Sequence, residues 1–231
     1  MPIIFWGSKD SLELTKGKSF VSLVGFQTLP LLVLSPTTLL ATTPSGSEQV
    51  FLILAYMAEI NFDYHPQFFT ATILEWKQLL TEDIYKDIII RSLLFLKNEG
   101  SIVVYGFVIM PNHIHLIWQI QDGHTRDLVQ MRFLKFTAQQ MKFKLLDSDD
   151  DRLTQFIVNA KDRKYQFWER NSLSIDLWSP KVFMQKLDYI HNNPLQDKWK
   201  LAQHPEEYKY SSARFYETGI DEFGLVTHHA G

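Results

Sequence analysis

The sequence IVVYGFVIMPNHIHLIWQI, residues 102–120, contains two apolar segments on either side of a Pro-Asn pair. Residues 102–110 form a continuous apolar run rich in β-branched and aromatic side chains, which is typical of a buried strand. Residues 113–120 alternate along the chain and predict a second strand. Because Pro111 and Asn112 interrupt the pattern and favour turns, the stretch predicts two consecutive strands of one sheet.

The segments on both sides of this strand pair also have regular patterns. They predict a strand at 68–76, helices at 83–97 and 125–146, one or two strands or a hairpin within 156–178, a helix at 180–193 and a short helix at 206–216. The helix at 180–193 has clear boundaries, since Ser179 is a typical N-cap, Pro180 suits the first helical position and Pro194 ends it. The order β-α-β-β-α-β-α predicts an α+β fold, with an antiparallel sheet and helices packed on one face.

The composition limits the chemistry open to the protein. The chain has 231 residues, of which 45% are apolar, 23 are Lys or Arg, 26 are Asp or Glu and none is Cys. This length and apolar fraction suit one or two ordinary domains and exclude a disordered, collagenous or coiled-coil protein. Without cysteine there is no disulfide, no Cys-ligated zinc, no iron–sulfur cluster and no thiol nucleophile. The net charge of −3 means that a nucleic acid would have to bind to a local basic face.

Residues 1–56 differ from the rest of the chain. They contain few charged residues and show neither helical nor strand periodicity. Their apolar stretch, 20–40, is interrupted by prolines and falls short of the roughly 18 to 20 uninterrupted apolar residues that span a membrane. We therefore expect residues 1–56 to be an extension without a stable fold, residues 57–231 to form the functional domain, and no membrane partner.

His113 and His115 are the sharpest local feature of the sequence. On a strand, residues i and i+2 point to the same face, about 6.6 Å apart along the backbone. Two imidazoles on one face can bind a single cation, while Ile114 turns the other way into the core. The alternative interpretation is an exposed strand face that simply carries two histidines.

Tyr189 and Asn193 are four residues apart on the predicted helix 180–193, so they share a helix face. A phenol and an amide oxygen placed opposite two imidazoles would supply a nucleophile beside a third metal ligand. The alternative is that Tyr189 is a core residue and that Asn193 only ends the helix before proline. Tyr208 and Tyr210 are rival nucleophiles, but neither has an amide one turn further along the chain.

Basic residues gather in two places. The helix 126–146 has five basic residues against one acidic residue, and a second cluster, 161–170, mixes basic and aromatic side chains. Cations and aromatic rings together suit single-stranded or hairpin DNA, because phosphates meet the cations and unpaired bases stack on the rings. The alternative is a solvated charged face over core aromatics. The candidate nucleic-acid contacts are Arg126, Arg132, Lys135, Lys142, Lys164, Trp168, Arg170 and Arg214.

Four ordered motifs resemble a known family. The His-hydrophobic-His segment is similar to the signature of single-tyrosine transposases, and in particular to REP-associated tyrosine transposases. The resemblance covers about residues 61–216 and rests on YGFVIMPNHIHLIW (105–118), YQFWER (165–170), LDYIHNNP (187–194) and YKYSSAR (208–214).

The resemblance implies a fold, an activity and a set of site residues. The fold is the ferredoxin-like sandwich of HUH endonucleases, and the activity is cleavage and rejoining of single-stranded or hairpin DNA in the cytoplasm, in association with the nucleoid. Tyr189 would attack the DNA and become joined to a 5′ phosphate. A divalent cation, Mg²⁺ or Mn²⁺, would be held by His113, His115 and Asn193. Relatives act as monomers or as homodimers.

Two other functions remain open at the level of sequence. The chain is either a transposase of this kind, a hairpin-binding module without catalysis, or a metal-dependent phosphodiesterase that hydrolyses DNA without a covalent intermediate. A covalent protein–DNA adduct distinguishes the first of these from the other two.

Overall fold

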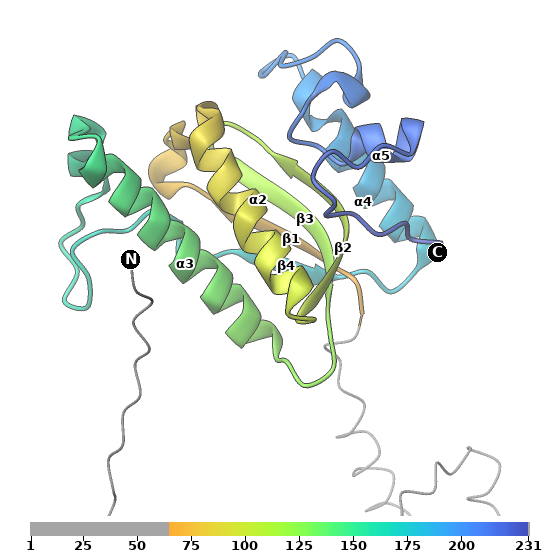
Figure 1. Cartoon of the computed structure of the whole chain (residues 1–231), viewed down its shortest axis with the longest axis horizontal. Helices are drawn as coiled ribbons and strands as arrows, with labels where there is room; N and C mark the ends of the chain where they lie inside the picture. Colours follow the sequence, from red (N-terminus) through yellow and green to blue (C-terminus); the bar gives the residue numbers. More distant parts are fainter. Residues whose placement is uncertain (1–64, 231) are drawn as a thin grey trace, which may run out of the picture. The chain divides into compact units, whose positions relative to one another are not determined.

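The computed structural model describes residues 65–230, which fold around a four-stranded antiparallel sheet (Figure 1). The predicted extension, residues 1–56, lies outside the described residues. The strands are β1 (Gln67–Thr72), β2 (Ile102–Ile109), β3 (His113–Ile120) and β4 (Leu173–Asp176). The α-helices are α2 (Asp83–Asn98), α3 (Arg126–Asp147), α4 (Pro180–Asn192) and α5 (Ala213–Thr218). No helix among residues 65–230 is long and apolar enough to cross a bilayer.

The strand order β2-β3-β1-β4 follows from a split β-α-β unit. β1 and β2 both pair antiparallel with β3, which lies between them, and α2 makes the crossover from β1 to β2. The chain then continues through β3 and α3 to β4, which pairs antiparallel with β1. This β-α-β-β-α-β order is ferredoxin-like. The α+β class and the antiparallel sheet predicted from the sequence are confirmed.

Both faces of the sheet are covered by helices. Along β3, Ile114 and Leu116 belong to the larger hydrophobic cluster, which also contains buried side chains of α2 and α3. Ile117 points the other way and belongs to a second cluster with Leu187 and Ile190 of α4. The sequence predicted helices on one face only, whereas α4 lies on the face opposite α2 and α3 (Figure 1).

Gly106 lets α4 lie close to the sheet. The register of β2 against β3 shifts between Val104 and Gly106, which leaves Tyr105 as an extra residue. A Cβ atom at position 106 would lie 2.7 Å from Cδ1 of Leu187 and 3.0 Å from Cδ1 of Ile190. Any side chain larger than hydrogen would therefore force Leu187, Ile190 or the helix that carries them to shift.

Three predicted elements differ from the observed ones. The strand predicted at 68–76 ends at Thr72, because residues 74–76 form a short 3₁₀ helix. Within 156–178 the observed strand is β4, and the chain at 157 and 165 makes only an isolated bridge.

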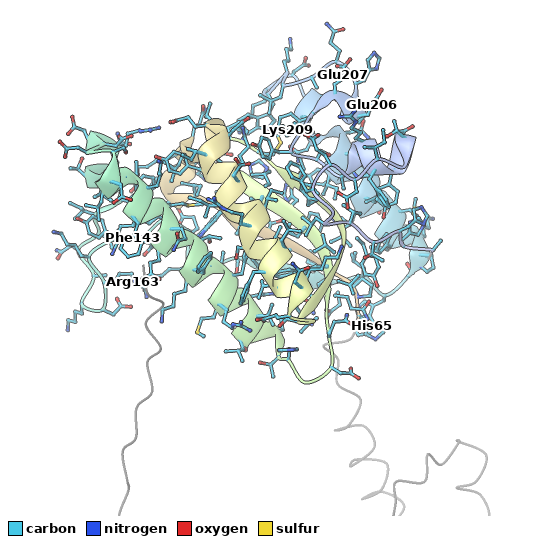
Figure 2. All side chains as sticks on the ribbon, in the orientation of Figure 1. His65, Phe143, Arg163, Glu206, Glu207 and Lys209 are labelled. Atoms are coloured by element: carbon cyan, nitrogen blue, oxygen red, sulfur yellow. The ribbon has the colours of Figure 1, made fainter. Side chains whose placement is uncertain are left out.

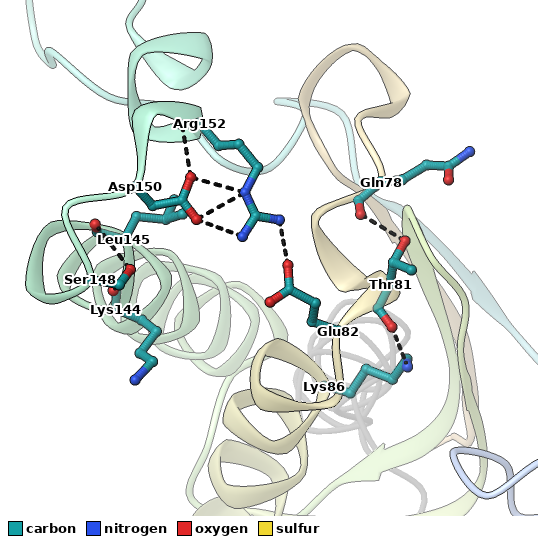
Figure 3. Close-up of polar contacts among 9 residues, drawn as sticks. All are labelled: Gln78, Thr81, Glu82, Lys86, Lys144, Leu145, Ser148, Asp150 and Arg152. Atoms are coloured by element: carbon teal, nitrogen blue, oxygen red, sulfur yellow. Dashed lines mark hydrogen bonds and ion pairs between the residues drawn. The ribbon is translucent and has the colours of Figure 1, made fainter.

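Arg152 connects the chain before this segment to the start of α2. Its guanidinium donates hydrogen bonds to Asp150 and to Glu82, the residue that precedes α2 (Figure 3).

The short helix predicted at 206–216 is not continuous. It is replaced by a 3₁₀ turn at Pro205–Glu207, a non-helical segment 208–212 that contains a turn at 209–210, and α5. Segment 208–212 pairs with β2 at one isolated bridge: the amide of Ile109 donates to the carbonyl of Tyr210, and the amide of Ser212 donates to the carbonyl of Phe107, each at 2.9 Å. Pairing with the outer strand β2 outweighs the local helical pattern here.

Candidate active site

The structure brings His113 and His115 together on the face of the sheet that α4 covers. Their ring centroids are 4.8 Å apart, and their side chains are nearly buried, with 7% and 6% of the residue surface exposed. The face is set by the strand period, since Ile114 between them lies in the opposite core. The histidines therefore do not lie on an exposed strand face, which removes the alternative interpretation of this motif.

Neighbouring side chains engage the Nδ1 atom of each imidazole. Nδ1 of His113 lies 2.7 Å from Oδ1 of Asn112, and the Nδ2 group of Asn112 donates to the backbone carbonyl of Trp76 at 3.1 Å. An amide oxygen only accepts, so Nδ1 of His113 carries the proton and Nε2 keeps its lone pair. Nδ1 of His115 lies 2.7 Å from the hydroxyl of Thr70, whose oxygen can accept a hydrogen bond in the same way. Such partners orient metal-binding histidines.

Both histidines are held in the neutral form. Burial lowers the pKa of His113 to about 4, and the positive charge of Lys198 contributes to this decrease. Burial, followed by the charges of His113 and Lys186, lowers the pKa of His115 to about 3. A neutral imidazole has a lone pair for a cation, so the pair is ready to bind a metal ion at neutral pH.

Tyr189 lies on α4 opposite the histidines and is open to solvent. Its ring centroid is 5.3 Å from that of His115 and 6.1 Å from that of Phe68, yet 44% of the residue is exposed. Leu187 on the same helix is buried in the core. Tyr189 is therefore not a core residue, and its hydroxyl group is accessible to a macromolecular substrate.

Asn193 ends α4 one turn after Tyr189 and is 2% exposed. Among the residues that the structure describes, three buried side-chain atoms have no hydrogen-bond partner: Nε2 of His115, Oδ1 of Asn193 and Nε1 of Trp118. The first two belong to the predicted metal ligands. Buried polar atoms are rarely left without a partner, so each of these two atoms has an unused bonding position that an additional group could fill.

The donor set suits a divalent cation. It consists of two imidazole nitrogens and one amide oxygen; the described residues contain no cluster of three or more His, Cys, Asp or Glu side chains suited to a metal ion. Imidazole suits Mn²⁺ better than Mg²⁺, which prefers oxygen ligands and several waters. The residues present thus fit a metal ion, with Mn²⁺ expected to bind more tightly than Mg²⁺.

The two rival tyrosines are already engaged in the fold. The hydroxyl of Tyr208 donates to the carbonyl of Ile109 at 2.7 Å, and that of Tyr210 donates to Oδ1 of Asp87 at 2.9 Å. Burial raises the pKa of both phenols well above the usual value. Both hydroxyls are engaged by acceptors within the fold, so of the three predicted tyrosines Tyr189 stays the candidate nucleophile.

The candidate DNA contacts on α3 lie on the other face of the sheet from the histidines, because α3 packs on the larger core. Several of them have acidic or aromatic partners. Arg126 pairs with Asp176 at 2.6 Å, and Arg132 pairs with Glu99 at 2.7 Å. Also on α3, Lys135 lies beside a groove between α2 and α3, and Lys142 lies over the ring of Phe143. The remaining candidates lie outside α3: Lys164 over the ring of Tyr165, Arg170 at 3.8 Å from Asp162, and Arg214 at 3.6 Å from Glu222. Figure 2 shows Phe143 and Arg163 on the α3 side of the molecule.

Trp168 is corrected by the structure. It is 6% exposed, belongs to the larger core, and donates a hydrogen bond from Nε1 to the hydroxyl of Thr137 at 3.0 Å. A buried ring offers no face to an unpaired base. The aromatic pattern around residue 168 reflects core packing, which was the alternative interpretation of that cluster.

Four residues near the histidines were missed in the sequence. The ammonium of Lys186 lies 4.7 Å from the ring centroid of Phe68 and 5.7 Å from that of Tyr189. Trp76, Lys198 and Trp199 gather on the His113 side of the site. The position of Lys186, three residues before Tyr189 on a predicted helix, was a usable signal. No sequence pattern connects Trp76 with residues 198 and 199.

Comparison with solved structures finds two transposases among the matches. A structure of a REP-associated tyrosine transposase bound to a REP hairpin is 17% identical, with a TM-score of 0.51, and the match covers 74% of this chain and 93% of that chain. A putative transposase from Deinococcus radiodurans R1 is 15% identical, with a TM-score of 0.38, covering 56% of this chain and 90% of that one. No protein-family model and no curated protein matches the sequence. The first likeness establishes a shared fold.

Proposed function

We propose that this protein is a metal-dependent transposase that cleaves and rejoins single-stranded or hairpin DNA through Tyr189. The observation that carries the proposal is an exposed phenol in ring contact with a buried pair of neutral imidazoles, one of which has a ring nitrogen without a partner. A tyrosine that only packs in the core, or only faces solvent, would not account for this arrangement of an exposed phenol beside buried neutral imidazoles.

The chain's own residues account for most of the reaction. His113, His115 and Asn193 would hold a divalent cation, which when bound polarises a phosphate oxygen and offsets the charge that develops during attack. The phenolic oxygen of Tyr189 forms a bond to phosphorus while the bond from phosphorus to the 3′ oxygen breaks. The phenol loses its proton and the departing 3′ oxygen gains one, so the step is balanced. The 5′-phosphotyrosine keeps the energy of the broken bond, and attack by a 3′ hydroxyl rejoins the strand without ATP.

Lys186 supports this assignment. Its ammonium lies on the same helix as Tyr189 and close to its ring, in a position to attract a phosphate that approaches the phenol. The solved structure with a TM-score of 0.51 is described with a REP hairpin bound. We therefore choose hairpin DNA with single-stranded flanks as the probe for this protein.

The test is a covalent selection. The full chain is incubated with Mn²⁺ and a pool of DNA hairpins that carry single-stranded flanks of random sequence, and denaturing electrophoresis separates protein joined to DNA. We expect an adduct whose sequenced DNA identifies one cleavage position. Tyr189→Phe should abolish the adduct and leave hairpin binding within about twofold, whereas the control Tyr208→Phe should keep the adduct.

Each other outcome selects a different function. Hairpin binding without adduct or product indicates a module that only binds DNA. Cleaved product without adduct indicates a hydrolytic phosphodiesterase. An adduct that survives Tyr189→Phe assigns the nucleophile to another residue and contradicts the proposal.

A further inference from the structure

Two tryptophans from distant parts of the chain flank His113. The ring centroid of Trp76 lies 6.3 Å from that of His113, and the centroid of Trp199 lies 5.8 Å from it. Tyr189 contacts the other histidine, His115. The ring contacts therefore connect Tyr189 with His115, and the two tryptophans with His113, the other member of the pair.

Trp76 and Trp199 share a cation. The ammonium of Lys198 lies 5.7 Å from the ring centroid of Trp76 and 4.8 Å from that of Trp199. Trp76 is 59% exposed, although a large apolar ring is normally covered when the fold allows it. Trp199 is half-buried against the second cluster. An exposed aromatic ring beside a cation is the combination by which proteins bind unpaired nucleotides: the base stacks on the ring and the phosphate meets the charge.

The backbone holds Trp76 in an uncommon conformation. Glu75 and Trp76 have φ values of 54° and 58°, in the left-handed region that non-glycine residues rarely adopt. The carbonyl of Trp76 accepts a hydrogen bond from Asn112, the same side chain that accepts from His113. One amide therefore fixes both a predicted metal ligand and the exposed tryptophan, which couples their positions. Residues held in this way gather at functional sites.

We propose that Trp76, Trp199 and Lys198 bind one unpaired nucleotide, the one that carries the departing 3′ hydroxyl. The proposal rests on the proposed function. In phosphoryl transfer the attacking and leaving oxygens lie roughly in line on opposite sides of phosphorus. Since Tyr189 attacks from the His115 side, the leaving nucleotide departs towards His113 and the tryptophans. Stacking there retains the free 3′ end, which is the group needed to rejoin the strand.

A fluorescence experiment tests base binding without any cleavage. The Tyr189→Phe protein is titrated with oligothymidine, which quenches a tryptophan on which a base stacks. We expect the quenched signal to fall when Trp76 is also changed to Phe, and to stay the same when Trp178 is changed. Trp178 is the matched control, because it is 60% exposed and lies against His65 rather than the histidine pair. Equal quenching in both double variants overturns the proposal.

A second experiment assigns the nucleotide. Using the hairpin that the covalent selection identifies, the base immediately 5′ of the cleaved phosphate is replaced by an abasic site. We expect this change to weaken binding about tenfold in the Tyr189→Phe protein, and to have little effect once Trp76→Ala is added. An abasic site on the 3′ side should weaken binding equally with and without Trp76→Ala. Coupling on the 3′ side, or on neither side, overturns the assignment.

The two proposals fail in distinguishable ways. If the wild type forms an adduct, but the abasic site weakens binding to the same extent on either side of the cleaved phosphate, only the nucleotide site is contradicted. If the wild type forms no adduct, the proposed function and the assignment to a leaving nucleotide both fall. In that case, quenching that depends on Trp76 still supports a site for unpaired bases, and quenching that does not depend on Trp76 removes it.

Discussion

Thr70 and Asn112 decide which nitrogen of each imidazole faces the candidate metal site. Both engage Nδ1, at 2.7 Å in each case, and both come from outside the His-x-His motif. With Nδ1 engaged, the lone pair of Nε2 is directed at the site. The orientation of the two imidazoles thus depends on two uncharged side chains that are not themselves predicted metal ligands.

At this scale we predict that Thr70→Val weakens Mn²⁺ binding by about 10- to 100-fold, because the valine methyl group cannot hydrogen-bond to the imidazole of His115. Isothermal titration calorimetry of the full chain with Mn²⁺ measures the change. The control is Thr72→Val, two residues along the same strand, where no hydrogen bond links the hydroxyl to a histidine. Equal affinity of the Thr70 variant and the wild type would show that Thr70 does not orient the ligand.

The sequence predicted the shared face of His113 and His115 but not their partners. A strand period of two residues is local information, and it was enough to place both rings on one side. Thr70 lies opposite His115 only because β1 pairs with β3 in one particular register, and local periodicity does not encode that register. Trp168 shows the converse: its neighbours suggested a DNA contact, while its burial comes from packing against α3.

At the scale of elements, the position of α4 controls the site. This helix carries Tyr189 and ends at Asn193, so both candidate groups move with it. Its contact with the sheet depends on the missing side chain at Gly106. The bulge beside Gly106 and the helix above it therefore belong to one structural unit, although they are about 80 residues apart in the sequence.

We expect Gly106→Ala to destabilise the fold by about 1–3 kcal/mol, because the added methyl group overlaps the side chains of Leu187 and Ile190. Displacement of α4 should also reduce adduct formation and Mn²⁺ affinity together. Urea denaturation gives the stability. Leu187→Val removes one methyl group at the contact, and the double variant should recover part of the loss. Strictly additive losses would mean that the two positions do not interact.

Element boundaries were predictable where capping signals were strong. α4 begins at Pro180, as the sequence indicated, because Ser179 accepts a hydrogen bond from the amide of Val182. The segment 206–216 lacked such signals. Its centre joins the outer strand β2 instead of forming a helix, and a long-range pairing of this kind leaves no trace in local periodicity.

At the scale of the whole molecule, the contact between the candidate nucleophile and the histidine pair forms within one chain. Tyr189 contacts His115 of its own chain, so a second copy is not needed to bring the phenol to the histidines. A homodimer, one of the two states implied by the resemblance, is not required for this contact.

Three histidines are buried in the neutral form: His113, His115 and His191. We therefore expect the free energy of unfolding to depend on pH.

We predict that acid destabilises the metal-free protein between about pH 6.5 and pH 4. Burial lowers the pKa of His191 to about 4, and its Nε2 lies 2.8 Å from the hydroxyl of Ser212. The unfolded chain binds a proton at about pH 6.5, so below that pH unfolding takes up protons and stability falls. His191 alone should cost about 2 kcal/mol between pH 7 and pH 5.

Chemical denaturation at several pH values, with a chelator present, measures this dependence. His191→Gln keeps a hydrogen-bonding group but removes the titration, and should flatten the curve by the contribution of one proton. The same change at the exposed His204 serves as the control. An identical slope in the His191 variant and the wild type would contradict the prediction.

Segment 208–212 also covers part of the outer edge of the sheet. Together with Thr227, whose amide donates to the carbonyl of Val104 at 2.8 Å, it occupies hydrogen-bonding groups of β2 that would otherwise form an unpaired sheet edge. Such an edge is a template for other chains, and natural proteins protect it. The opposite edge is β4, which has only four residues and is a poor template. We expect a chain cut before Pro205 to self-associate through β2, so the C-terminal segment protects the protein from aggregation.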